Sequence, residues 1–317
     1  MSTTIPPTIL VVGATVNTGA GLVNTLPRLL PSKPAFKNHR LLALTRSANS
    51  STAQKIANIP GVTIEEKDWL KITPEWLRER NVVRMFVASH NEPTQFADEG
   101  QLLTNALQAR IKYVVRISTG APAVTPNFPA YYPRTHWAIE TMLGQPEFAA
   151  MHWTSLRPNL FVGLVVSPAV EFIRHVQSTG QQETLSIVLD ENTSTGVIDP
   201  FDVGVFAAQL LSQDDSTPFN QQGYTLNGPA DITGRQLNEM VEKEIGDTVH
   251  KVTYKDVFWV DGRAGKSDRK NLVLSNKRAL DPIWNGHAKA ETISPEVLKL
   301  APPKETAEAT LRKMLAG

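Results

Sequence analysis

The sequence predicts an α/β fold, a Rossmann-type doubly wound parallel sheet with a smaller C-terminal α/β domain. Near the N-terminus, the apolar run at residues 8–12 ends at Gly13 and passes through a short polar turn into a helical segment. Further apolar runs then alternate with helical segments roughly every 20 to 30 residues, a pattern typical of parallel strands joined by crossover helices. The length of 317 residues is sufficient for such a sheet and a second domain.

The spacing of apolar residues predicts the individual elements. We expect strands over residues 8–12, 40–47, 62–65, 82–88 and 113–117, a sixth strand within 153–161 that runs into a loop, and short strands at 184–189, 196–198 and 223–226. We expect helices over residues 20–30, 95–109, 131–143, 199–211, 234–245, 294–300 and 306–315. Residues 1–160 then form the core domain, to which about 184–228 return, and residues 161–317 form mainly the C-terminal region.

Composition argues against several classes of partner. The formal net charge is +1, which gives no electrostatic reason to expect nucleic acid. No apolar window approaches the length of a membrane span, and the first seven residues lack the features of a secretory signal. Cysteine is absent, so disulfides and thiolate chemistry are excluded. We therefore expect a cytoplasmic protein, a monomer or homodimer, that acts on a small molecule and binds neither nucleic acid nor membrane.

The turn at residues 13–19 reads Gly-Ala-Thr-Val-Asn-Thr-Gly. A strand, a tight turn and a helix in this order present backbone N–H groups and a helix N-terminus to a phosphate. In a G-x-x-G-x-x-G loop the middle glycine lets the backbone approach a pyrophosphate, and here Val16 occupies that position. Its Cβ and methyl groups predict a loop that shifts outward or binds the phosphate more weakly.

Polar residues follow several of the predicted strands. Arg46 follows the second strand, where an acidic residue would bind a ribose 2′-hydroxyl and an arginine accommodates a 2′-phosphate. Arg46 therefore favours NADP(H), although it is also compatible with a solvated arginine at a strand end. Ser89, His90 and Ser118 follow the fourth and fifth strands. Because parallel strands end at one edge of a sheet, we expect these side chains to converge there with Gly13.

Five motifs occur in order along the chain. They are Gly-Ala-Thr-x-Asn-Thr-Gly at 13–19, Leu-Thr-Arg at 44–46, His-x-x-x-Glu at 136–140, Leu-Arg-Pro-Asn-x-Phe at 156–161 and Asn-Gly-Pro at 227–229. Together they resemble the NmrA-like family of atypical short-chain dehydrogenases/reductases, in particular members from fungal secondary metabolism. The resemblance implies an NADP-binding Rossmann domain and a smaller substrate domain. The family includes reductases, NADP-sensing regulators and tailoring enzymes.

The resemblance also implies the cofactor contacts. The turn would hold the dinucleotide, Arg46 the 2′-phosphate, and Ser89 and His90 the nicotinamide ribose. Ser118 would lie near the nicotinamide, and Asn159 and Phe161 would line the nicotinamide side of a substrate pocket. The expected cofactor-binding residues are Gly13, Thr15, Val16, Asn17, Thr18, Gly19, Arg46, Ser89, His90, Ser118, Asn159 and Phe161.

Candidate acid–base residues follow from a second comparison of spacing. In short-chain dehydrogenases a serine, a tyrosine and a lysine one helical turn later act together in proton transfer. Ser118 and Tyr132 have this spacing, and His136 replaces the lysine. Tyr132 or His136 is thus a candidate proton donor, with Ser118 as polar support and Glu92 as a further candidate acid. Alternatively, the tyrosine only packs and the histidine bonds a backbone carbonyl. Glu140 could orient the imidazole or be an ordinary helix carboxylate.

Three functions remain open from the sequence. The first is an NADP(H)-dependent oxidoreductase acting on a small, largely apolar organic substrate, such as a secondary metabolite. The second is a redox-neutral isomerase, for example of the epoxide or semipinacol rearrangement type, which retains NADP(H) as part of the pocket wall. The missing lysine and Val16 favour this alternative. The third is a non-catalytic NADP sensor. No group of residues has metal-ligand spacing, so we expect no metal site.

Overall fold

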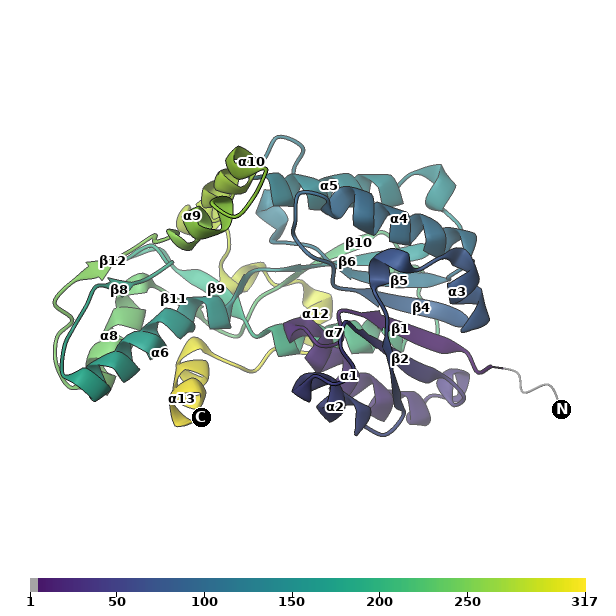
Figure 1. Cartoon of the computed structure of the whole chain (residues 1–317), viewed down its shortest axis with the longest axis horizontal. Coiled ribbons are helices and arrows are strands. Elements are labelled where there is room, and N and C mark those ends of the chain that lie inside the picture. Colours follow the sequence, from purple (N-terminus) through teal and green to yellow (C-terminus); the bar gives the residue numbers. More distant parts are fainter. Residues whose placement is uncertain (1–4) are drawn as a thin grey trace.

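The computed structural model describes residues 5–317 (Figure 1). Residues 1–4, which belong to the stretch in which we expect no secretory signal, lie outside the described residues. The chain forms a larger lobe around a long parallel sheet and a smaller lobe beside it (Figure 1). Within residues 5–317, no helix is both long and apolar enough to span a membrane.

The larger lobe is built on a seven-stranded sheet with the order β10-β6-β5-β4-β1-β2-β3. Each neighbouring pair in this sheet is parallel. The strand order reverses between β1 and β4, as in dinucleotide-binding folds, which confirms the predicted fold class. The strands are β1 (Thr8–Val12), β2 (Arg40–Thr45), β3 (Val62–Glu66), β4 (Val82–Val87), β5 (Tyr113–Ile117), β6 (His152–Pro158) and β10 (Gln222–Leu226).

Helices cover both faces of this sheet (Figure 1). One face carries α1 (Asn17–Leu29), α2 (Ser51–Ala57), α7 (Pro200–Leu211) and α12 (Pro295–Leu300). The other carries α3 (Pro74–Glu79), α4 (Gln95–Gln108) and α5 (Tyr131–Leu143). Along β1, Ile9 and Val11 join the core under α1 and α7, whereas Leu10 and Val12 join the core under α3 and α4. A strand buried on both faces therefore reads as an uninterrupted apolar run.

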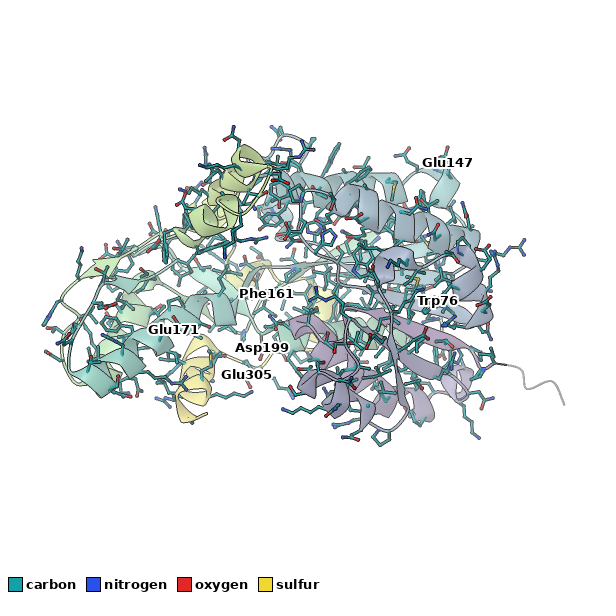
Figure 2. The ribbon with its side chains drawn as sticks, in the orientation of Figure 1. Trp76, Glu147, Phe161, Glu171, Asp199 and Glu305 are labelled. Carbon is teal, nitrogen blue, oxygen red and sulfur yellow. The ribbon has the colours of Figure 1, made fainter. Side chains whose placement is uncertain are left out.

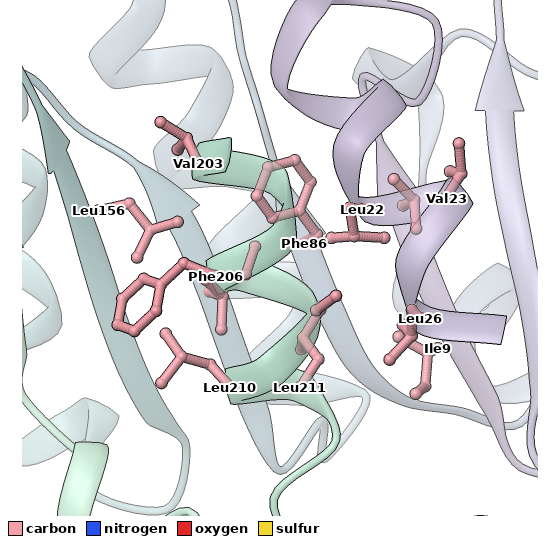
Figure 3. Close-up of a cluster of buried hydrophobic side chains, with 14 of the residues drawn as sticks. Ile9, Leu22, Val23, Leu26, Phe86, Leu156, Val203, Phe206, Leu210 and Leu211 are labelled. Carbon is pink, nitrogen blue, oxygen red and sulfur yellow. The ribbon is translucent and has the colours of Figure 1, made fainter. Parts of the chain in front are cut away.

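Helices α1 and α7 pack side by side against the sheet. Leu22 and Leu26 of α1 and Phe206 and Leu210 of α7 belong to one buried cluster, and Figure 3 shows Phe206 and Leu210 on the side of α7 that faces Leu156 of β6. The two backbones cross at glycines. A Cβ on Gly204 would lie 2.1 Å from the carbonyl oxygen of Thr18, and one on Gly21 would lie 2.0 Å from that of Phe201.

The smaller lobe contains α6 (Val162–Thr179), α8 (Gly234–Ile245) and α13 (Ala307–Ala316). A three-stranded sheet has the order β11-β9-β7, and a two-stranded sheet pairs β12 with β8. These strands are β7 (Leu160–Phe161), β8 (Leu185–Ser186), β9 (Thr195–Ile198), β11 (Asp231–Ile232) and β12 (Val252–Thr253). Short helices α9 (Trp259–Ala264), α10 (Lys270–Leu274) and α11 (Asp281–Trp284) bring the chain back toward the larger lobe (Figure 1).

Two differences from the sequence expectation bear on the site. Helix α1 begins at Asn17 rather than Ala20, so the polar half of the turn is already helical. The segment 153–161, expected as a strand that runs into a loop, forms two strands, β6 and β7, separated at Asn159. There the side-chain amide nitrogen of Asn159 donates to the carbonyl oxygens of Gly196 and Ala288, each at 2.7 Å. At this residue the chain passes from the large sheet to the three-stranded sheet. Within the range 184–228, β8 and β9 lie in the smaller lobe, and α7 and β10 lie in the larger one.

Candidate functional site

Three cavities adjoin where the strands of the large sheet end. The loop cavity, of about 350 Å³, lies over the turn at 13–19 and the ends of β2 and β4. The inner cavity, of about 260 Å³, lies beyond β5 and is closed by α9, α11 and the 3-10 helix Ser275–Arg278. The outer cleft, of about 1080 Å³, runs along α6. Phe161 lines all three cavities and lies between the two lobes (Figure 2).

The turn at 13–19 forms the floor of the loop cavity. Gly13 has a φ of +85°, and a Cβ there would lie 2.7 Å from the carbonyl oxygen of Ala88, so glycine brings the turn against the end of β4. Gly19 lies beneath, where a Cβ would lie 2.1 Å from the Gly13 carbonyl oxygen. Gly19 itself does not line the cavity, but five other residues of the predicted turn do: Gly13, Thr15, Val16, Asn17 and Thr18.

Val16 occupies the position at which sequence reasoning expected glycine. Its φ of −93° is accessible to any residue, so the backbone itself does not require glycine here. The side chain is 46% exposed and lines the loop cavity. Val16 is also the N-cap of α1 and provides no side-chain hydrogen bond, which leaves the first N–H groups of the helix available to an anion. The effect of Val16 on phosphate binding stays a prediction.

Two cations line the opposite part of the loop cavity. Arg46 follows β2 and Lys67 follows β3, and the two strands are neighbours in the sheet. Sequence reasoning identified Arg46 and missed Lys67, although Lys67 stands at the equivalent position after its own strand. A pair of cations at this edge matches the charge of a phosphate group better than one arginine alone.

Ser89 and His90 also line the loop cavity, as expected, but each has a carboxylate partner. The Ser89 hydroxyl donates to Glu99 Oε2 at 2.6 Å. His90 Nε2 lies 3.1 Å from Asp98 Oδ2. Both carboxylates come from α4, so this helix fixes the polar residues that follow β4.

A buried arginine in β5 connects these groups to the rest of the site. Arg116 is fully buried, and its Nε donates to Glu99 Oε1 at 2.5 Å. Its Nη1 donates to Ser155 Oγ at 3.3 Å, and its Nη2 donates to His136 Nδ1 at 2.9 Å. Glu99 is fully buried as well, so the two charges are paired out of contact with water. Sequence reasoning missed Arg116, whose signal was a charged residue inside an apolar strand.

Glu140 forms a second carboxylate centre beside Arg116. It accepts a hydrogen bond from Ser118 Oγ at 2.7 Å and pairs with Arg157. Burial raises the pKa of Glu140, but the Arg157 hydrogen bond and the charges of Arg116 and Arg157 outweigh it and hold that pKa below its usual value. Glu140 is therefore ionised and fixes the Ser118 proton, so the Ser118 oxygen that lines the inner cavity is left to accept hydrogen bonds.

The protonation state of His136 follows from this network. A guanidinium group only donates, so Nδ1 accepts from Arg116 and the ring hydrogen resides on Nε2. His136 lines the loop cavity, is 2% exposed, and its Nε2 is buried without a partner among the described residues. Burial and the charge of Arg116 hold the pKa of His136 well below its ordinary value. At neutral pH the ring is uncharged, and its Nε2–H is a buried donor.

This uncharged histidine predicts a pH dependence of stability. An unfolded histidine binds a proton below about pH 6.5, and buried His136 does not, so the unfolded state gains protons as the pH falls. We expect the His136 contribution to lower the free energy of unfolding by up to about 1.4 kcal/mol per pH unit below about pH 6.5. The free energy of unfolding, measured with urea at several pH values, should depend less steeply on pH for His136→Gln than for the wild type. The exposed His287→Gln variant should keep the wild-type slope, and equal slopes in all three proteins would contradict the assignment.

Tyr132 and Asn159 both line the inner cavity. The Tyr132 ring meets the His136 ring edge to face with centroids 6.2 Å apart. Burial raises the pKa of Tyr132, so its hydroxyl is protonated at neutral pH. No lysine occupies the next helical turn. The side-chain nitrogen of Asn159 donates to Gly196 and Ala288 of the smaller lobe and so holds the end of β6 against that lobe.

Glu92 lies apart from the other candidate acids. It lines none of the three cavities, and its carboxylate is 56% exposed and 3.2 Å from Arg263 of α9. Arg263 does line the inner cavity. The ion pair thus connects the loop after β4 to the smaller lobe, and a proton-transfer role for Glu92 stays a prediction. Among residues 5–317, no cluster of histidine and carboxylate side chains is arranged to hold a metal ion.

Comparison with known proteins identifies the fold. No protein-family model and no curated sequence matches this chain. Among solved structures, it is similar to an NADPH-dependent quinone oxidoreductase from Escherichia coli in complex with NADPH, at 18% identity, a TM-score of 0.69, and coverage of 96% of this chain and 99% of that one. A Citrobacter triphenylmethane reductase complexed with NADP(H) is similar at 17% identity, a TM-score of 0.66, and coverage of 97% and 99%.

A third similar structure is NmrA, a negative transcriptional regulator, in complex with NAD. It is 15% identical, with a TM-score of 0.67 and coverage of 98% of this chain and 96% of that one. At these identities the comparisons establish the architecture over nearly the whole chain. This chain has the fold of NAD(P)-binding Rossmann proteins that carry a second, smaller lobe.

Proposed function

We propose that the chain is an NADP(H)-dependent reductase of a compact, largely apolar organic molecule. The observation that carries the proposal is the junction of two cavities of different character. The loop cavity has a glycine turn, a helix N-terminus and two cations, and the inner cavity is mostly apolar. Both are lined by Asn91, Ile117 and Phe161, so a dinucleotide in the first would reach a substrate in the second.

The residues of the loop cavity fit NADP(H) on two counts. The positive φ of Gly13 and its lack of a Cβ bring the turn against the end of β4. Arg46 and Lys67 suit the 2′-phosphate that distinguishes NADP(H) from NAD(H). Ser89 and His90 would lie beside the nicotinamide ribose, and Ser118, Asn159 and Phe161 beside the nicotinamide.

When bound, reduced NADP supplies a hydride equivalent. Tyr132 is the group that we assign to proton delivery, because its hydroxyl is protonated at neutral pH and lines the inner cavity. His136 remains neutral and serves as a hydrogen-bond donor rather than as an acid. Arg116 and Glu140 hold His136 and Ser118 in place. The similar proteins named for reduction of quinones and triphenylmethane compounds support this reaction class.

The test is an assay of the purified protein with NADPH and a panel of quinones, triphenylmethane dyes and fungal aromatic metabolites. Loss of NADPH absorbance together with a product heavier by two hydrogen atoms is the expected result. NADPH binding without any conversion would overturn the proposal and favour the regulatory function for which NmrA is named.

A redox-neutral isomerase is the second candidate. It is favoured by His136, which stands one helical turn after Tyr132 in place of the lysine of the family pattern. In the family pattern a lysine lowers the pKa of the tyrosine, and here burial raises the pKa of Tyr132 instead. A phenol that holds its proton is better suited to hydrogen bonding or acid catalysis than to acting as a base. A product of unchanged mass, formed without loss of NADPH, would establish this alternative.

Cofactor preference provides a prediction for Arg46. We expect Arg46→Ala to weaken NADPH binding about tenfold or more, because one charge-assisted contact to the 2′-phosphate is lost, and to leave NADH binding within about twofold. Isothermal titration calorimetry measures both affinities. Arg28→Ala is the matched control, since Arg28 lies in the last turn of α1, at the end away from the phosphate loop. An equal loss for NADPH and NADH would contradict a 2′-phosphate contact.

A further inference from the structure

The outer cleft is the largest of the three cavities, and the proposed reaction does not use it. It has a volume of about 1080 Å³ and is lined by residues of both lobes. Asn17 of α1 and Asp199, which precedes α7, belong to the wall formed by the larger lobe. The smaller lobe contributes one face of α6, made of residues three or four positions apart: Leu164, Ser167, Pro168, Glu171, Phe172 and His175. Helix α6 therefore turns one face toward a cavity.

The outer cleft continues into the inner cavity. Phe161, Leu164 and Trp259 line both of them. In Figure 2, Phe161 lies between the two lobes, and Glu171 lies farther out on the smaller lobe. A molecule whose reacting end occupies the inner cavity, of about 260 Å³, can therefore extend past Leu164 and Trp259 along α6.

Exposed aromatic side chains border the outer cleft. Phe258 and Trp259, at the start of α9, both line it and are 67% and 37% exposed. Leu164 on α6 is 41% exposed. Large apolar side chains that are left exposed around one cavity indicate a surface that a ligand covers. The faces of the two aromatic rings also suit a positively charged group.

The charges of the outer cleft have one sign. Four carboxylates line it, and among its lining residues within 5–317 there is no lysine or arginine: Glu171, Glu183, Asp199 and Asp256 are the charged residues besides His175. The loop cavity has the opposite character, since it is lined by Arg46 and Lys67 and by no carboxylate of the described chain. Because the whole chain has a net charge of only +1, this separation of charge is local. A cleft of one sign attracts a ligand of the other sign and repels one of its own.

Glu171 is the carboxylate of the cleft that is available to a ligand. Its side chain is exposed and forms no ion pair or hydrogen bond with another residue of the range 5–317. Asp199 and Asp256 each use Oδ1 to accept a hydrogen bond from the backbone N–H two residues later. Glu183 lies 3.9 Å from Nε2 of His175. A cation in the cleft would therefore pair first with Glu171.

A proline in α6 adds a neutral acceptor to the same face of the helix. Pro168 has no N–H, so the carbonyl oxygen of Leu164, four residues earlier, lacks its usual helical donor. Both residues line the outer cleft, and Pro168 lies one turn before Glu171. An ammonium group carries several N–H donors and no acceptor, so it matches a face that offers only acceptors.

We propose that the outer cleft binds the distal part of the substrate, and that the substrates are elongated, largely apolar ring compounds that carry a positively charged amine. The reacting ring lies in the inner cavity, and the ammonium group lies in the outer cleft near Glu171. The inference rests on the proposed function for the position of the reacting end. The selection of a cation by the outer cleft is a property of binding and can be measured without turnover.

The test compares three probes on protein in the presence of NADP⁺. The probes share a naphthyl ring and a butyl chain and end in an ammonium, a hydroxyl or a carboxylate group. Calorimetric titration of the wild type should show the ammonium probe binding about tenfold or more tightly than the hydroxyl probe, and the carboxylate probe binding most weakly. The advantage of the ammonium probe should shrink as the salt concentration rises. Equal affinities of the ammonium and hydroxyl probes, tightest binding of the carboxylate probe, or binding of none of the three would overturn the inference.

Variants assign the preference to the outer cleft. The double variant Glu171→Gln with Asp256→Asn removes two charges at constant volume, and the preference for the ammonium probe should fall to about threefold or less. Glu239→Gln removes an exposed carboxylate of α8 that lines none of the three cavities, and the preference should persist. A full preference in the double variant would overturn the assignment. If the double variant does not fold, Glu171→Lys replaces it at an exposed position of α6, and there the carboxylate probe should bind more tightly than the ammonium probe. An unchanged order of affinities in Glu171→Lys would overturn the inference.

The outcomes separate this inference from the proposed function. A preference for the ammonium probe without NADPH consumption by any substrate supports the inference and overturns the reductase proposal. Reduction of quinones by a protein that binds the ammonium and hydroxyl probes equally supports the reductase and overturns the inference.

Discussion

Replacing Arg116 with methionine is expected to lower the free energy of unfolding by about 3–5 kcal/mol. Both Arg116 and Glu99 are fully buried, and the substitution leaves the Glu99 carboxylate without its cationic partner. Ser89 and Gln95 would still donate to Glu99 Oε2, but neutral donors compensate a buried charge only in part. Methionine preserves much of the arginine volume, so the loss reports the charge rather than a cavity. Urea unfolding monitored by circular dichroism measures it.

Two variants show that the effect arises from an unpaired buried charge. Arg312→Met removes one partner of an exposed pair with Glu308, in which the side chains are 59% and 50% exposed, and should cost less than about 1 kcal/mol. The double variant Arg116→Met with Glu99→Gln should recover a large part of the loss, because no charge is then left without a partner. A loss for Arg116→Met as small as that for Arg312→Met would refute the argument.

The central strands could be predicted from the sequence because both faces of the sheet are covered by apolar cores. Residues 8–12 and 113–117 have apolar cores on both faces, so their strands are nearly continuous apolar runs that a linear reading detects. The position of the site at one edge of the sheet could be predicted from topology alone, because the residues that follow parallel strands all lie at that edge. Arg46, Ser89, His90 and five residues of the turn at 13–19 line one cavity.

The smaller lobe shows where sequence reasoning ends. Its contributions to the inner cavity come from α9, α11 and the 3-10 helix Ser275–Arg278, which are too short to carry a periodic pattern. Asn276 lines this cavity and gave no signal, because the cavity wall is assembled from segments far apart in the chain. Side chains that approach from distant segments acquire their role only through those contacts.

The role of His136 illustrates a similar limit at a residue that was identified. The sequence suggested a proton donor, because an unperturbed histidine titrates near neutral pH. The structure places its Nδ1 beside Arg116, a residue of β5, and buries the ring. The neighbour determines the tautomer, and burial lowers the pKa of His136. Arg116 stands out in the sequence as a charged residue inside an apolar strand, but the sequence does not show that its side chain contacts His136.

Gly204→Ala is expected to destabilise the protein by about 3 kcal/mol or more, because the methyl group has no space at the crossing of α1 and α7. The new Cβ would lie 2.1 Å from the Thr18 carbonyl oxygen, 2.6 Å from the Leu22 nitrogen and 2.8 Å from the Gly21 Cα. All three are backbone atoms, so no side-chain rotation relieves the contact. Only a movement of α1 away from α7 does, at the expense of the buried cluster between them (Figure 3).

The same substitution at Gly262 provides the matched control. Gly262 lies in helix α9, and a Cβ there would have no atom within 4 Å. Gly262→Ala should therefore stabilise the protein by about 0.5–1 kcal/mol through helix propensity alone. If Gly204→Ala lowers the free energy of unfolding and Gly262→Ala raises it, the destabilisation by Gly204→Ala arises from the contact between the two helix backbones. Because α1 begins directly at the phosphate turn, a displaced α1 should also weaken NADPH binding in the fraction that folds. Unfolding free energies of the same sign, or NADPH affinity unchanged in folded Gly204→Ala, would argue against this coupling of helix packing to the site.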